Sequence, residues 1–148
     1  MSAGAFADSS ALVKLYADEQ GSDAVRRYPH LVVSQLARVE VPAALWRKHR
    51  MGELAATDAR ILVADFEADY FGDGDEPPCF SIIATTANIL DAAARLVGVH
   101  GLRAYDAVQL ASALAAADAV PEGVAFLAYD GALNAAAAVE GLTSTIGR

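Results

Sequence analysis

Short apolar runs alternate along the chain with longer segments in which apolar residues recur every three to four positions. A short, uninterrupted apolar run is typical of a buried β-strand, and the longer period is typical of an amphipathic helix. Alanine-rich stretches such as "NAAAAVEG" contain good helix formers, so we count them with the helices. The strands predicted from this pattern are residues 4–8, 31–33, 80–83, 124–128 and 143–146.

Helical patterns lie between these strands. Strands that alternate with helices favour right-handed crossovers and a mainly parallel sheet that is covered on both faces, so the predicted fold class is α/β. A chain of 148 residues fits one domain, and we expect residues 1–148 to form it. The predicted helices are residues 9–18, 22–28, 35–50, 54–70, 86–98, 105–118 and 131–139.

Composition narrows the class of protein. The chain is 55% hydrophobic and 20% charged, which is typical of a globular domain. Its one cysteine, Cys79, can form neither an internal disulfide nor a thiolate zinc site. No apolar run reaches the ~18 residues of a membrane span, and the N-terminal residues do not resemble a secretory signal. We therefore expect a cytoplasmic protein that is not inserted in a membrane.

The formal net charge of −8 bears on possible partners. A surface with this excess of negative charge repels nucleic-acid phosphates, which argues against binding through a broadly basic surface. An enzyme that acts on RNA would need bound cations or a local patch of arginine and lysine to reverse the charge.

Two aspartates stand where a predicted strand ends and a helix begins. Asp8 follows "AFA", and Asp130 follows "VAFLAY". Ligands bind at the carboxyl ends of strands in open parallel sheets, so both side chains are expected at the binding edge. Aspartate is also a preferred N-cap residue, and the sequence leaves both interpretations open for each residue.

Two further acids lie in helical segments. Helical spacing in "QLARVEVPAALW" places Glu40 with Leu36 and Ala43, on the side that is expected to face the core. A buried carboxylate needs a partner, which could be an arginine, a hydrogen-bond network or a cation. Asp106 lies in or just before the first turn of the predicted helix 105–118, where it could serve as a cap. If the four acids converge, a hard divalent cation would relieve their repulsion.

Four stretches of the chain match a known protein family in their order and approximate spacing. They resemble the PIN-domain ribonucleases, and most closely the VapC-type toxins of bacterial toxin–antitoxin pairs. The resemblance covers nearly the whole chain and is least distinctive over residues 51–80. The stretches are "DSSALVKLYADE", "SQLARVEVPAALWR", "GLRAYDAVQLASAL" and "LAYDGALNAAAAVEGL".

This resemblance implies a three-layer α/β/α sandwich and an acidic site for Mg²⁺ or Mn²⁺. Asp8, Glu40, Asp106 and Asp130 match the family's catalytic metal-site positions, and Ser10 matches a hydroxyl residue that supports the first aspartate. The implied activity is metal-dependent endonucleolytic cleavage of RNA, with a metal-activated water as the nucleophile. The implied regulator is a small antitoxin protein of the VapB type. Closely packing alanine-rich helices also lead us to expect a homodimer.

Arginines near the acids are the candidates for contact with RNA. Arg38, close to Glu40 on the same predicted helix, is the first candidate. The run "RKHR" at residues 47–50 is the second, although a basic helix end that interacts with the helix dipole explains it equally simply. The sequence does not decide whether Arg47, Lys48 and Arg50 contact RNA.

Two other functions remain open. The chain could be a different carboxylate-metal phosphohydrolase in which Asp8 is phosphorylated. However, the haloacid-dehalogenase phosphatases have a second aspartate at the position that Ser10 occupies here. Alternatively, the acids could be only caps and ion pairs in a non-catalytic scaffold, with "LARVEVPAALW" as an interface helix. No G-x-S-x-G motif indicates a serine nucleophile.

Overall fold

The computed structural model of the chain describes residues 4–144 and contains a five-stranded parallel sheet with strand order β3-β2-β1-β4-β5. Every predicted strand is present, and residues 145–146 of the last one lie outside the described residues. The strands are β1 (Ala5–Ala7), β2 (Leu31–Ser34), β3 (Phe80–Ile83), β4 (Ala125–Leu127) and β5 (Thr143–Ser144).

The helices lie close to their predicted positions, with one correction. The predicted helix 9–18 is too long, because the α-helix ends at Leu12 and a 3₁₀ turn follows it. The chain then turns at Gly21, whose φ of 96° is left-handed, and the Ser22 hydroxyl accepts a hydrogen bond from the Glu19 amide. The helices are α1 (Ser9–Leu12), η1 (Val13–Leu15), α2 (Ser22–Arg26), α3 (Ala37–Arg50), α4 (Ala56–Phe71), α5 (Ala87–His100), α6 (Ala104–Ala119) and α7 (Gly131–Val139).

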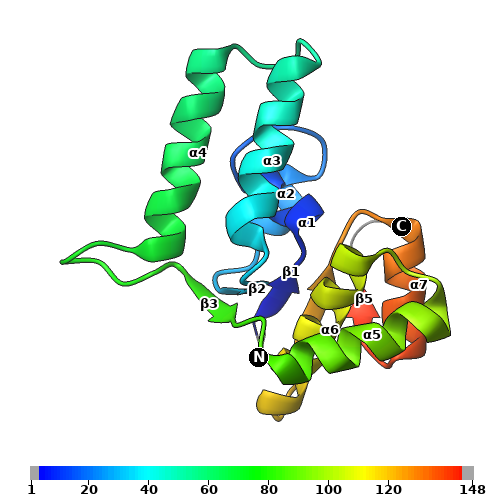
Figure 1. Ribbon diagram of the computed structural model, residues 1–148. Helices are drawn as coiled ribbons and strands as arrows, with labels where there is room; N and C mark the ends of the chain where they lie inside the picture. The colour runs from blue at the N-terminus through cyan, green and yellow to red at the C-terminus, as the bar shows by residue number, and fades with distance from the viewer. Residues whose placement is uncertain (1–3, 145–148) are drawn as a thin grey trace.

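Helices cover both faces of the sheet (Figure 1). On one face Phe6 and Phe126 stack with ring centroids 6.1 Å apart and pack with α5, α6 and α7. On the other face, Leu31 and Val33 of β2 pack with the N-terminal helices and with α3 and α4. The alternation of side chains along each strand thus gives a buried core on each side. The predicted three-layer α/β/α sandwich is confirmed.

The strand order places two strand ends side by side. β1 and β4 are neighbours, with Ala7 paired to Leu127 at their carboxyl ends. From β1 the chain moves outward to β2 and β3, and it then crosses back to β4 and β5. The order of connection therefore reverses between β1 and β4, and this switch point is where open parallel sheets bind ligands. Asp8 and Asp130 follow these two strands.

Helix α3 turns a different face to the core from the one expected. Its buried residues are Ala37, Val41 and Leu45, which repeat every four positions. Glu40 lies beside this face and is half-buried, and Val39 is 69% exposed. The prediction that Glu40 sits on the core-facing side is therefore wrong, because the stripe that buries the most apolar surface is one residue away.

The described residues 4–144 contain no helix that combines the length and the apolar character needed to cross a membrane.

The α3–α4 side of the core depends on one aromatic residue of α4. Phe66 is fully buried, and its ring contacts those of Tyr16, Tyr70 and Phe80 at centroid distances of 5.7, 5.7 and 6.4 Å. It therefore joins α4 to the sheet edge and to the N-terminal helices. If this side chain were removed, residues from several elements would line the cavity, and it would not collapse easily because those elements are held apart by the rest of the fold.

We predict that Phe66→Ala lowers the free energy of unfolding by about 3–5 kcal/mol, since a large buried ring is removed. Denaturant unfolding followed by circular dichroism measures this change. Ile61→Ala, on the exposed face of the same helix, is the matched control and is expected to have a small effect. A Phe66→Ala loss no larger than that of the control would contradict the assigned role of the ring.

Candidate active site

A cavity of about 330 Å³ lies at the carboxyl ends of β1 and β4, and acids from four separate elements line it. Asp8 and Asp130 come from the ends of these strands, Glu40 from α3, and Asp106 from α6. The structure therefore brings all four predicted acids to one place. The remaining lining residues are Ser9, Ser10, Ala44, Arg47, Arg103 and Gln109.

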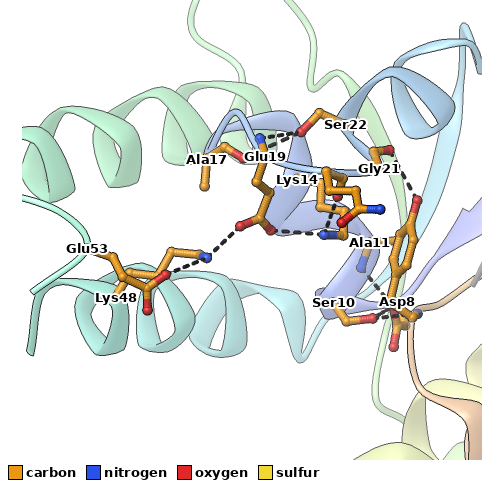
Figure 2. Close-up of polar contacts among 12 residues, drawn as sticks. Asp8, Ser10, Ala11, Lys14, Ala17, Glu19, Gly21, Ser22, Lys48 and Glu53 are labelled. Carbon is orange, nitrogen blue, oxygen red and sulfur yellow. Dashed lines mark hydrogen bonds and ion pairs between the residues drawn. The ribbon is translucent and has the colours of Figure 1, made fainter. Parts of the chain in front are cut away.

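Asp8 both caps a helix and lines the cavity. Its Oδ1 accepts hydrogen bonds from the Ala11 amide at 3.0 Å and from the Ser10 hydroxyl at 2.7 Å (Figure 2). The side chain is nevertheless only 4% exposed, and this burial raises the pKa of Asp8 from 3.8 to about 7, with smaller upward contributions from Glu40 and Asp106. A carboxylate in this environment is stabilised by a nearby cation.

The Ser10 hydroxyl connects the ends of the two central strands. It donates to Asp8 and accepts a hydrogen bond from the Tyr129 amide at 3.0 Å. The Tyr129 hydroxyl in turn donates to the Gly21 carbonyl at 3.1 Å. Lys14 lies 4.5 Å from the centroid of the Tyr129 ring. These contacts hold the loop after β4 against the loop before α2.

Glu40 is held by hydrogen bonds rather than by an arginine. Its Oε1 accepts from the Ser9 hydroxyl at 2.8 Å and from the Gln109 amide nitrogen at 2.7 Å. The same amide nitrogen donates to the Ser9 hydroxyl at 3.0 Å. Of the three partners that the sequence left open for this carboxylate, the structure therefore contains the hydrogen-bond network.

The other two acids face one arginine. Arg103 Nη2 lies 3.4 Å from Asp106 Oδ2 and 3.7 Å from Asp130 Oδ2. Its side chain is 83% exposed, so these ion pairs contribute little to stability. Asp130 also caps α7, because its Oδ1 accepts from the Leu133 amide at 2.8 Å. Asp106 lies in the first turn of α6 and does not cap it.

The residues that line the cavity suit a hard divalent cation in their chemistry. Within residues 4–144, no three acidic, histidine or cysteine side chains are close enough together to hold a metal ion as they stand. The cavity lining offers carboxylate and hydroxyl oxygens, which Mg²⁺ and Mn²⁺ prefer, it contains no histidine or cysteine, and it has space for ordered water. The burial that raises the pKa of Asp8 also disfavours its charged form unless a cation lies nearby. The donor set therefore fits such an ion, which Asp8, Glu40, Asp106 and Asp130 would hold.

The predicted RNA contact Arg38 is not among the residues that line this cavity. It forms an ion pair of 2.8 Å with Glu67 and lies 5.2 Å from the centroid of the Phe71 ring, both on α4. In the basic run at the end of α3, Arg47 lines the cavity and Lys48 pairs with Glu19 at 2.6 Å. Arg47 is therefore the arginine of α3 that lines the cavity together with the acids.

Sequence reasoning missed three residues of this cavity as candidates, namely Ser9, Arg103 and Gln109. Arg103 and Gln109 each lie three positions from Asp106, on either side of it, and three-residue spacing puts helical residues on one face. A glutamine within the apolar stretch "AVQLAS" was the available signal for Gln109. Ser9 carried no comparable signal, because its importance comes from a contact with α3.

The sequence matches the PIN domain family over residues 5–138. The chain belongs to the PIN-domain family. It is 35% identical over 115 residues to Ribonuclease VapC45 and to Ribonuclease VapC49, from two strains of Mycobacterium tuberculosis (CDC 1551 / Oshkosh and ATCC 25618 / H37Rv), and the match covers 75% of this chain and 75% of each relative. It is thus a PIN-domain protein of the VapC type, and the family predicted from the sequence is confirmed.

Two solved structures are similar in fold to this PIN domain. One is a toxin–antitoxin complex from Klebsiella pneumoniae, with a TM-score of 0.55 and 18% identity over 86% of this chain and 87% of that one. Another is PAE2754 from Pyrobaculum aerophilum, with a TM-score of 0.58 and 23% identity over 90% of this chain and 78% of that one. At these identities the likeness establishes the arrangement of the PIN fold only.

The raised pKa of Asp8 makes stability depend on pH. The folded protein holds the proton of Asp8 up to about pH 7, whereas the unfolded chain releases it near 3.8. The stability of the wild type therefore falls as pH rises from about 4 to about 7 and is constant above that range, as far as this group is concerned.

We predict that Asp8→Asn is more stable than the wild type at pH 8, in a buffer with a chelator, by up to roughly 4 kcal/mol. The uncharged amide oxygen can still accept the two hydrogen bonds. This difference should shrink as pH falls and approach zero below the unfolded-state pKa of 3.8, where Asp8 is protonated in both states. Unfolding measured across this pH range tests the prediction, and a difference that does not change with pH would refute it.

Proposed function

We propose that this protein is an endoribonuclease that depends on Mg²⁺ or Mn²⁺ and acts as the toxin of a toxin–antitoxin pair. The main support is the convergence of Asp8, Glu40, Asp106 and Asp130 on one cavity at the switch point of a VapC-type PIN fold. The relatives that match most of the chain are themselves called ribonucleases. The reaction is hydrolysis of a phosphodiester bond of RNA.

The proposal assigns two roles to the residues of the cavity, binding of the ion and orientation of a residue that binds it. When bound, the divalent ion supplies a water of lowered pKa and neutralises negative charge on the phosphoryl oxygens. Asp8, Glu40, Asp106 and Asp130 hold the ion, and Ser10 orients Asp8 through its 2.7 Å hydrogen bond. No covalent nucleophile is required.

Arginines at the rim offset the net charge of −8 where RNA would bind. Arg47 and Arg103 line the cavity, and Arg103 is exposed on a long side chain that can exchange its carboxylate partners for a phosphate. Arg50 extends this positive charge along the outer face of α3. The role of Arg38 in RNA binding stays a prediction, and its ion pair with Glu67 favours Arg47 instead.

A small antitoxin protein of the VapB type is the proposed regulator. A groove of about 550 Å³ borders the acidic cavity and shares Glu40 with it. Its walls include the exposed apolar side chains of Val39, Met51 and Tyr105, so a partner seated there would bury apolar surface beside the acids. One solved neighbour is a toxin–antitoxin complex, which agrees with this proposal. The homodimer also stays a prediction, and sedimentation equilibrium would test it.

We predict that Asp106→Asn and Asp8→Asn each reduce RNA cleavage at least ~100-fold, because an oxygen ligand of the ion loses its charge. The measurement is cleavage of a labelled RNA in the presence of Mg²⁺ or Mn²⁺. Asp91→Asn, an exposed residue of α5, is the matched control and should cleave like the wild type. Undiminished cleavage by both site variants, with contaminating nuclease excluded, would overturn the proposal.

Titration with Mn²⁺ separates this function from that of a non-catalytic scaffold. An ion that binds the folded protein raises the Tm as its concentration rises. The wild type should show this rise, and Asp106→Asn should show a much smaller one. A wild type without any rise would favour the scaffold.

We predict that Arg47→Gln weakens RNA binding more than Arg38→Gln does, and that it reduces the slope of log K against log salt concentration by about one. Arg47 lines the cavity, whereas Arg38 already forms an ion pair with Glu67 of α4. Fluorescence anisotropy with an uncleaved RNA and catalytically inactive Asp106→Asn protein measures both slopes. Equal slopes for the two variants would contradict this assignment.

A further inference from the structure

Gln109 is a buried polar residue in a helix that is buried on most sides. It is 2% exposed, and most of the other buried residues of α6 are apolar, with Val108 and Leu110 beside it in the sequence. Buried polar groups in native proteins are normally satisfied by hydrogen bonds. The amide nitrogen of Gln109 meets this rule, because it donates to Glu40 and to Ser9. The amide oxygen does not, since it is buried without a hydrogen-bond partner.

The contacts fix the orientation of the Gln109 amide. Its nitrogen is 2.7 Å from Glu40 Oε1, which can only accept a hydrogen bond when ionised. The reversed amide would place two oxygens at that distance, and their lone pairs would repel each other. Gln109 therefore donates to Glu40 while its own oxygen stays unsatisfied. An arrangement with this energetic penalty indicates a requirement other than stability.

The same contacts distinguish the two oxygens of Glu40. Both donors, Gln109 and the Ser9 hydroxyl, contact Oε1. Neither contacts Oε2, so Oε2 is the oxygen that remains for a cation. Gln109 also follows Asp106 by three residues on α6. The proposed ligand Asp106 and the residue that holds Glu40 therefore lie on the same turn of one helix.

We propose that Gln109, together with Ser9, is a positioning residue that fixes the Glu40 carboxylate of α3 relative to Asp106 of α6. This inference rests on the proposed metal site and adds to it a residue that acts through Glu40. The two donors saturate Oε1 and restrain the rotation of the carboxylate. Outer-shell hydrogen bonds of this kind typically change metal affinity by 10–100-fold when they are removed.

The test is Mn²⁺ binding to the full-length protein, followed by electron paramagnetic resonance of the free ion. Gln109→Leu keeps the approximate volume and removes the donor, and we expect it to weaken Mn²⁺ binding about 10-fold. Ser9→Ala should weaken it less, because the Gln109 donor remains. Ser112→Ala is the matched control on the same helix, since Ser112 is equally buried but donates only to the Val108 carbonyl. It should bind Mn²⁺ like the wild type.

A double-variant cycle shows whether Gln109 acts through Glu40. In the Glu40→Ala background, which removes the acceptor, Gln109→Leu should cause no further loss of Mn²⁺ affinity, whereas a purely structural effect of Gln109 would persist there. A Gln109→Leu variant that binds like the wild type, or that loses affinity equally in both backgrounds, would overturn the inference. Circular dichroism checks folding, and Gln109→Met replaces Gln109→Leu in the cycle if that variant unfolds.

The same measurement distinguishes this inference from the proposed function. A wild type that does not bind Mn²⁺ would refute the metal site and the inference with it. A wild type that binds Mn²⁺, and loses it in Asp106→Asn but not in Gln109→Leu, would leave the proposed function standing and refute only the role of Gln109.

Discussion

The gathering of carboxylates at the switch point, partly removed from water, is the constraint on which the rest of the site depends. The parallel sheet brings the ends of β1 and β4 together, and Asp8 follows β1 directly while Asp130 lies three residues after β4. Glu40 and Asp106 then enter the same cavity from helices on opposite faces of the sheet. The fold thus concentrates negative charge in a partly dehydrated space, where like charges interact strongly.

The surrounding residues stabilise this negative charge in different ways. Ser10 and a backbone amide stabilise the charge of Asp8, although burial dominates and its pKa stays raised. Glu40 accepts hydrogen bonds from two neutral donors, and Asp106 and Asp130 both form ion pairs with the exposed Arg103. None of these arrangements places a fixed positive charge deep in the cavity. That pattern suits a site whose positive charge comes from an exchangeable ion.

Much of the architecture could be predicted from the sequence because its signals are local. Strand and helix periodicity located every strand, and the order of the elements gave the three layers. Asp8 and Asp130 were ambiguous between cap and site, and the structure shows that each caps a helix and also lines the cavity. The environment of Glu40 could not be predicted, because it depends on Gln109, which lies 69 residues away in the sequence. Pairings at that range are decided by how α3 and α6 pack on the sheet.

Gly21 carries a consequence for mutational tolerance. Its left-handed φ already disfavours other residues, and a Cβ at this position would lie 2.6 Å from the Tyr129 hydroxyl oxygen. The aromatic ring would have to tilt away, which would disturb its hydrogen bond to the Gly21 carbonyl. The backbone amide of Tyr129 donates to the Ser10 hydroxyl, so this surface loop is linked to the first aspartate through one residue. Substitutions at this glycine are therefore expected to disturb the acidic cavity in chains that still reach their native fold.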